Sequence, residues 1–134
     1  MKSIAIAVAA LVGFVMIPAR PVSAGTKVVS TTFITSNPDG SGMASGALGA
    51  TRNSSNDTEY NGCILWADGG GPAAICQAQD AAGTTRYCYT ATPRFIEVLK
   101  GSTSDEYLVF SWDAQGMCTY VAVYNFSMDG PKLP

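Results

Sequence analysis

The residues whose type and spacing point most directly to chemistry are the four cysteines. Cys63, Cys76, Cys88 and Cys118 follow one another at intervals of 13, 12 and 30 residues. A four-cysteine zinc site is typically built from two close Cys-x-x-Cys pairs, which this spacing does not provide. In an oxidising compartment an even number of cysteines predicts disulfides instead. We therefore expect two disulfides and no metal site.

Histidine is absent from the chain. Its absence excludes Ser-His-Asp and Cys-His nucleophile systems and every zinc or copper site with histidine ligands. Proton transfer would depend on carboxylates, and the closest in sequence are Asp57 with Glu59 and Asp105 with Glu106. Nothing in the sequence places two carboxyls across a cleft, as glycoside hydrolysis requires. We therefore assign no catalytic residue and no cofactor.

The first 24 residues have the pattern of a secretory signal. Met1 and Lys2 give a short positive start, residues 4–17 are a nearly unbroken apolar run, and residues 22–24 are of the kind that signal peptidase recognises. That run of 14 residues is shorter than the roughly 20 that a membrane span needs. We expect cleavage after Ala24, a single mature domain at 25–134 that is secreted or periplasmic, and no membrane insertion after cleavage.

The charge of the mature part limits its partners. Without residues 1–24 the chain has six basic and ten acidic side chains, a net charge near −4. Its Lys and Arg are scattered, whereas nucleic acids and anionic membranes are bound by clustered positive charge. We therefore expect neither as a partner.

Three tetrapeptides, at 37–40, 80–83 and 113–116, each begin with Asn or Asp and end with Gly. The first side chain can accept hydrogen bonds from backbone amides ahead, and Gly adopts a positive φ without a Cβ clash. This pattern is typical of a type I turn followed by a left-handed glycine in a hairpin loop. Flanks rich in Thr, Val, Ile and Tyr favour hairpins over plain loops.

If the first residue of each turn pairs with the residue four positions on, the turn fixes the register of its hairpin. The cross-strand pairs predicted in this way are Ile34–Ala44 and Phe33–Ser45 in the first hairpin, Cys76–Cys88, Gln77–Tyr87 and Ile75–Tyr89 in the second, and Trp112–Cys118, Phe110–Tyr120 and Val109–Val121 in the third.

A further strand is expected at about 58–66, joined to the second hairpin by a loop at 67–72. If these strands pair, Cys63 comes level with Cys76, so the sequence leaves both Cys63–Cys76 and Cys76–Cys88 open as disulfides. A hydrogen-bonded cross-strand pair is a poor position for a disulfide, because disulfides prefer closely spaced Cβ atoms. Counting outward from the turn places Cys76 and Cys88 at such a pair. We therefore favour Cys63–Cys76 with Cys88–Cys118.

One short helix is expected after the second hairpin. Thr92 fits its N-cap, Pro93 its first position and Gly101 its C′ stop. Its apolar stripe consists of Phe95, Ile96 and Leu99. A helix of about eight residues does not persist alone, so it must pack on the sheet.

Three segments carry weaker signals. Residues 41–50 are so rich in small side chains that they predict a strand only weakly. Residues 51–57 are polar and expected to be an exposed loop, and residues 129–134 a frayed C-terminus. The whole predicts a mainly β protein, a single small antiparallel β-sandwich or barrel-like domain of about seven strands with one short helix, stapled by two disulfides.

The best candidate for a functional surface is aromatic. On the pleat the sheet residues of one face would be Tyr60, Ile64, Trp66, Ile75, Gln77, Tyr87 and Tyr89, and those of the other Cys63, Leu65, Ala74, Cys76, Ala78 and Cys88. If the cysteine face packs inward, the first is a ligand platform, with Trp66, Gln77, Tyr87 and Tyr89 as the candidate ligand residues. We favour the alternative, in which the aromatic face is the core, because large side chains supply most burial energy. Four aromatic residues of the third hairpin are also expected in the core: Phe110, Trp112, Tyr120 and Tyr124.

These features favour an exported non-enzymatic binding protein, inhibitor-like or adhesive, whose partner is an extracellular or periplasmic protein or a glycan. One alternative is a carboxylate-dependent hydrolase of glycans. Another is a structural or antigenic surface protein without catalysis.

Overall fold

The computed structural model describes residues 29–126 and residue 128. The predicted signal, the boundary at residue 25 and the predicted C-terminal loop lie outside these residues. The described chain forms a four-stranded sheet in the order β1-β2-β6-β7 and a three-stranded sheet in the order β3-β4-β5, all neighbours being antiparallel. The strands are β1 (Phe33–Ser36), β2 (Gly42–Ala47), β3 (Tyr60–Asp68), β4 (Gly71–Gln79), β5 (Thr85–Thr90), β6 (Tyr107–Trp112) and β7 (Cys118–Tyr124).

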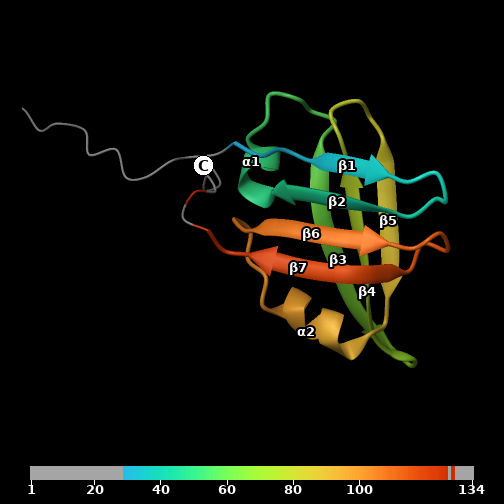
Figure 1. Ribbon diagram of the computed structural model, residues 1–134. Helices are drawn as coiled ribbons and strands as arrows, with labels where there is room; N and C mark the ends of the chain where they lie inside the picture. Colours follow the sequence, from blue (N-terminus) through green and yellow to red (C-terminus); the bar gives the residue numbers. More distant parts are fainter. Residues whose placement is uncertain (1–28, 127, 129–134) are drawn as a thin grey trace, which may run out of the picture.

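The two sheets form two layers whose strands cross, with helix α2 (Pro93–Lys100) beside β7 (Figure 1). The predicted mainly β fold with two disulfides is therefore confirmed. A second short helix, α1 (Leu48–Arg52), was not expected. It covers the last three residues of the segment 41–50, weakly predicted as a strand, and the first two of the segment predicted as an exposed loop. Thr51 is buried there, with its hydroxyl 3.2 Å from that of Thr32. The predicted exposure is therefore wrong at Thr51.

All three predicted hairpin turns are present. The terminal glycines Gly40, Gly83 and Gly116 have φ of 89°, 82° and 79°, in the left-handed region that disfavours other residues. The side-chain Oδ1 of Asp80 accepts hydrogen bonds from two backbone amides ahead, and that of Asp113 does the same. These turns are built from contacts within five residues, which is why the sequence alone predicts them.

The first two hairpins have the predicted registers, and the third has only part of it. Trp112 lies opposite Cys118 as expected, but the register then shifts, so that Phe110 pairs with Val121. The predicted pairs Phe110–Tyr120 and Val109–Val121 are therefore wrong. Thr119 is the extra residue of a β-bulge, which lets both Cys118 and Val121 turn into the interior.

Because of the bulge, two of the four aromatic residues of the third hairpin that were predicted in the core lie outside it. Phe110 and Trp112 are buried as expected, whereas Tyr120 and Tyr124 are exposed. Without the extra residue, Tyr120 would share the inward face of Cys118, since side chains alternate along a strand. With the bulge, Val121 takes the inward position instead of Tyr120.

Strand β3 lies two residues later than predicted, and both β3 and β4 extend into the segment predicted as a loop. Their pairing continues to Asp68 opposite Gly71, which leaves a two-residue turn in place of the expected loop at 67–72. Asp68 caps this turn by accepting a hydrogen bond from the amide of Gly70 (2.8 Å). Helix α2 begins and ends as predicted, with Thr92 as N-cap, but Gly101 is its C-cap in a right-handed conformation and not a left-handed C′ residue.

The disulfides are Cys63–Cys76 and Cys88–Cys118, as favoured from the sequence. In an antiparallel sheet the N–H and C=O of one residue point to the same neighbouring strand. A Cys76 that hydrogen-bonds to β5 therefore forms a non-hydrogen-bonded pair with Cys63 on β3. The Cα atoms of that pair are 4.0 Å apart, in keeping with the closer of the two pair types.

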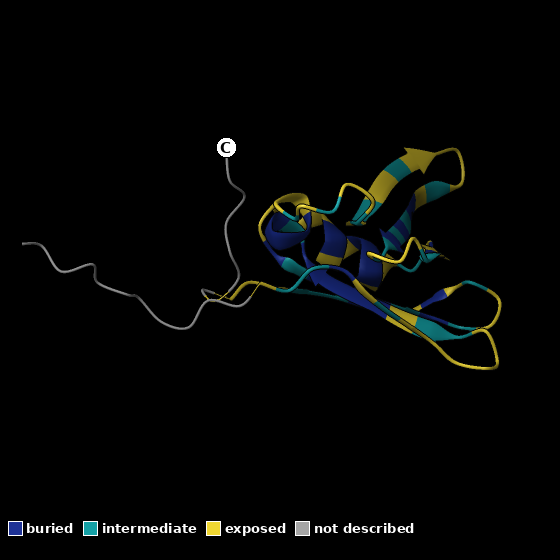
Figure 2. Cartoon of the chain, turned by 90° about the horizontal axis from the view of Figure 1, so that it is seen from above, coloured by how far each residue is buried: buried dark blue, intermediate teal, exposed yellow. Residues whose placement is uncertain are grey.

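The core lies between the layers, and exposed residues gather at the hairpin turns (Figure 2). From the three-stranded sheet it receives small side chains, Ala74, Ala78, Cys76 and Cys88, all fully buried. The large side chains of the core come from the opposite sheet and from α2, and include Phe95, Ile96, Leu99, Phe110 and Trp112. Small residues thus face large ones across the interior, the arrangement that fills the space without voids.

Candidate functional site

The outward face of the three-stranded sheet carries Tyr60, Ile64, Trp66, Ile75, Gln77, Tyr87 and Tyr89, a set that we call the aromatic face. Ile64 is 66% exposed and Tyr87 62% exposed, while Trp66 and Gln77 are half-buried. The interpretation favoured from the sequence, that these residues form the core, is therefore wrong. The opposite layer and α2 already supply enough bulk to fill the interior, so the large side chains of this sheet stay outside.

The centre of the aromatic face is an apolar row that crosses all three strands. Ile64 lies opposite Ile75, which in turn lies opposite Tyr89. The ring of Tyr89 contacts that of Trp66, with centroids 6.1 Å apart and planes tilted by 47°. Such a tilted pair is a favourable aromatic arrangement, and it fixes both rings in place.

Polar groups on the aromatic face are few. The side-chain amide of Gln77 donates a hydrogen bond of 2.6 Å to the hydroxyl of Tyr60. None of the seven residues carries a charge, and the nearest acidic residue along β3, Asp68, caps the turn at its end. These seven side chains are therefore uncharged and mainly apolar.

In each of the two carboxylate pairs considered for hydrolysis, at least one member has a structural partner. Glu59 accepts a hydrogen bond from the hydroxyl of Ser54 (2.7 Å), and the buried Glu106 accepts one from the backbone amide of Thr103 (2.6 Å). Each of four cavities in the described chain is lined by one carboxyl at most. Since glycoside hydrolysis requires two carboxyls flanking one bond, the geometry gives the hydrolase alternative no support.

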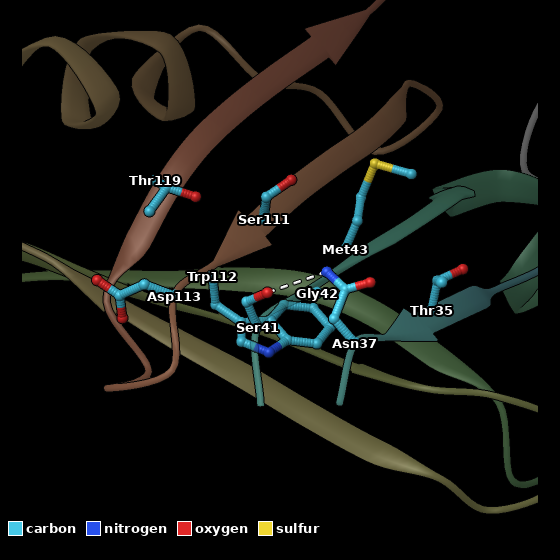
Figure 3. Close-up of a pocket in the computed structure, with 9 residues that line it drawn as sticks. All are labelled: Thr35, Asn37, Ser41, Gly42, Met43, Ser111, Trp112, Asp113 and Thr119. Atoms are coloured by element: carbon cyan, nitrogen blue, oxygen red, sulfur yellow. Dashed lines mark hydrogen bonds between the residues drawn. The ribbon is translucent and has the colours of Figure 1, made fainter. Parts of the chain in front are cut away.

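The largest of these cavities was missed by sequence reasoning. It is a shallow pocket of about 470 Å³ on the four-stranded sheet, which we call the hydroxyl pocket. Asp113 and Thr119 lie at one end of it and Asn37 and Thr35 at the other (Figure 3). Its remaining lining residues are Ser41, Gly42, Met43, Ser111 and Trp112. The turns at 37–40 and 113–116 signalled both ends, but only the β2–β6 pairing brings them together.

A chain of hydrogen bonds holds one end of the hydroxyl pocket. The amide of Asn37 donates to the hydroxyl of Ser41 (2.9 Å), which donates to a carboxylate oxygen of Asp39 (2.7 Å). The hydroxyl and backbone amide of Ser41 together lower the pKa of Asp39 below its ordinary value, because both stabilise the charged form. Asp39 therefore stays ionised, which keeps Ser41 and Asn37 in place.

A second group of exposed aromatic side chains lies near the end of β7. The hydroxyls of Tyr120 and Tyr124 are 2.9 Å apart, and the ring of Tyr124 stacks on that of Phe126. The hydrogen bond to Tyr124 raises the pKa of Tyr120, since it favours the protonated hydroxyl. Here, in contrast to the aromatic face, two tyrosine hydroxyls pair with each other.

Comparison with protein-family models, with curated proteins and with solved structures finds no match. Over residues 29–126 and 128, no helix is long and apolar enough to cross a membrane, and no cluster of three metal-ligating side chains is present. The two disulfides indicate an oxidising compartment. Fold and staples define the class: a small disulfide-bonded antiparallel β protein.

Proposed function

We propose that this chain is an exported, non-enzymatic binding protein whose aromatic face docks an extracellular or periplasmic protein. The observation that carries the proposal is the exposure of Ile64 and Tyr87 on a neutral surface whose large side chains the fold leaves outside. Aromatic and aliphatic residues of this kind supply most of the energy at protein interfaces, since their burial removes large apolar areas from water.

The polar groups of the aromatic face favour a protein over a glycan as its partner. A sugar ring presents hydroxyls on every side, and each must find a hydrogen-bond partner when it is buried. Here the amide of Gln77 and the hydroxyl of Tyr60 already bind each other, and Ile64 occupies the centre of the row. An apolar protein surface fits such a face at lower cost.

Export is the first part to test. Mass spectrometry of the protein recovered from the periplasm or medium should give the mass of a chain beginning at Gly25, less four hydrogens for the two disulfides. A mass that retains residues 1–24, or free thiols, would contradict the export step.

The docking step is tested by photo-crosslinking. A photoreactive phenylalanine at position 87 should crosslink a protein of the periplasm or medium, and that protein, once purified, should bind the wild-type chain directly. Tyr87→Ala should weaken this binding about thirtyfold, the loss expected for an interface anchor worth roughly 2 kcal/mol. Tyr120→Ala is the matched control, because Tyr120 is a similarly exposed tyrosine on the other sheet.

Three outcomes contradict the docking step. Equal affinity of the Tyr87→Ala and wild-type chains for the purified partner removes the aromatic face from the interface. Binding of a glycan array that Tyr87→Ala abolishes would assign the face to a sugar. Crosslinking only to other copies of this chain would favour the structural alternative.

A further inference from the structure

The hydroxyl pocket differs from the aromatic face in the state of its polar groups. The side-chain hydroxyls of Thr35, Ser111 and Thr119 line it, and within the described chain they have no hydrogen-bond partner. All three are at least partly exposed to solvent. These hydroxyls are therefore available to donate and accept hydrogen bonds with a ligand in the pocket (Figure 3).

The β-bulge on β7 contributes one of these hydroxyls. In a regular hairpin Thr119 would pair with Ser111, but here Ser111 pairs with Tyr120 and Thr119 is the unpaired extra residue. Bulges frequently re-aim a side chain at the edge of a binding site. This bulge brings the hydroxyl of Thr119 to the pocket beside that of Ser111.

The two ends of the pocket are rigid. Asp113 uses its Oδ1 to accept hydrogen bonds from the amides of Gln115 and Met117, and these fix the orientation of its carboxylate. Asn37 is held through its amide nitrogen by Ser41. In the part of the chain that the structure describes, Oδ2 of Asp113 and Oδ1 of Asn37 have no partner, so each is a positioned acceptor.

Apolar contact in the pocket comes from Met43, which is 40% exposed and lies on β2 between Thr35 and Ser111, whereas Trp112 is 4% exposed and belongs to the core. The indole of Trp112 donates a hydrogen bond of 3.0 Å to the carbonyl of Gly40. It approaches Gly42 so closely that a Cβ there would lie 2.5 Å from a ring carbon, which explains why glycine occupies this position. The pocket thus combines fixed polar acceptors and hydroxyls with the apolar side chain of Met43.

We propose that the hydroxyl pocket binds a neutral saccharide unit. A saccharide presents several hydroxyls on an apolar ring skeleton, which matches the hydroxyls of the pocket, its two fixed acceptors and the exposed side chain of Met43 between them. Anions are disfavoured because no Lys or Arg lines the pocket and Asp113 does. The volume of about 470 Å³ is within the roughly 300–1,000 Å³ common for small-ligand sites.

The test is an NMR titration of the full secreted chain, labelled with nitrogen-15, against cellobiose, maltose, xylobiose, diacetylchitobiose and the cationic control glucosamine. At least one neutral disaccharide should shift the amides of Thr35, Ser111 and Thr119 in a saturable way. Thr119→Val and Ser111→Ala should each weaken that binding about fivefold, the effect of losing one neutral hydrogen bond. Tyr87→Ala is the control and should bind the sugar as the wild type does.

The source of the sugar is read from a second arm. Retention on insoluble cellulose, xylan or chitin that Thr119→Val reduces would identify a polysaccharide, and binding of the soluble disaccharides alone would identify free sugars. Either result supports a saccharide site. The proposal is overturned if no neutral probe shifts these amides, if only glucosamine does, or if both substitutions leave affinity unchanged. None of these results bears on the docking of a protein at the aromatic face, since the two surfaces lie on different sheets.

Discussion

The two faces of the three-stranded sheet have opposite characters. The centre of the cysteine face, with Cys76 and Cys88, is fully buried and carries small side chains, whereas the aromatic face is largely exposed and carries large ones. At the margin of the cysteine face, Leu65 is 38% exposed. A rule that places the largest apolar side chains inside would predict that the aromatic face is buried and the cysteine face exposed. The difference teaches that which face is buried depends on the volume that the opposite layer supplies, because interiors are close-packed and accept a limited volume.

The largest expected effect is a loss of stability on truncating a buried side chain that packs against the cysteine face. Phe110 is fully buried in the cluster that packs against the cysteine face. Phe110→Ala should therefore cost about 3 to 5 kcal/mol of unfolding free energy, through lost burial and the cavity left behind. Denaturant unfolding measures it, and a loss below about 1 kcal/mol would mean that the core lies elsewhere.

The disulfides come next. Replacing Cys88 and Cys118 together by Ala should lower the unfolding free energy by about 3 kcal/mol, because the unfolded chain regains the entropy of an open loop. This bridge spans 30 residues and joins the two sheets, whereas Cys63–Cys76 spans 13 within one sheet. The paired replacement of Cys63 and Cys76 should therefore cost less in the same urea titration. The reverse order would show that the layers do not depend on the bridge between them.

The turns set the register on which both faces depend. Gly83→Val and Gly116→Val should each destabilise by about 1 to 2 kcal/mol, since a β-branched residue tolerates positive φ poorly. Gly62→Val is the control, because a Cβ at Gly62 meets nothing within 4 Å and its φ is not positive. Thermal melts compare the three, and equal midpoints for Gly83→Val and wild type would contradict the observed turn.

The smallest effect on stability belongs to the aromatic face. Tyr87→Ala should change the unfolding free energy by less than about 0.5 kcal/mol, as for most exposed positions. Tyr89→Ala should cost about 1 kcal/mol, because it also removes the ring contact with Trp66. If Tyr87→Ala instead melts well below the wild type, Tyr87 is part of the core and the difference between the two faces disappears.

Much of the fold was predictable because it is local. The turns at 80–83 and 113–116 depend on an Asp side chain, a glycine with positive φ and contacts within five residues. The local sequence is therefore enough to predict them. From the turn at 80–83 followed the register of β4 with β5, and from that register the favoured disulfide pairing. The start of α2 followed from Thr92 and Pro93, which occupy its N-cap and first position as predicted.

The sequence by itself thus determined the turns, two hairpin registers, the helix α2 and the presence of two disulfides, whose pairing it favoured without deciding it. Only the tertiary structure decided that the aromatic face lies outside, that Thr119 bulges and that residues 48–52 coil into α1. It also brought the turns at 37–40 and 113–116 to one pocket. The reason is physical: a turn is stabilised by its own few residues, whereas burial is a competition for a limited interior volume among residues far apart in the chain.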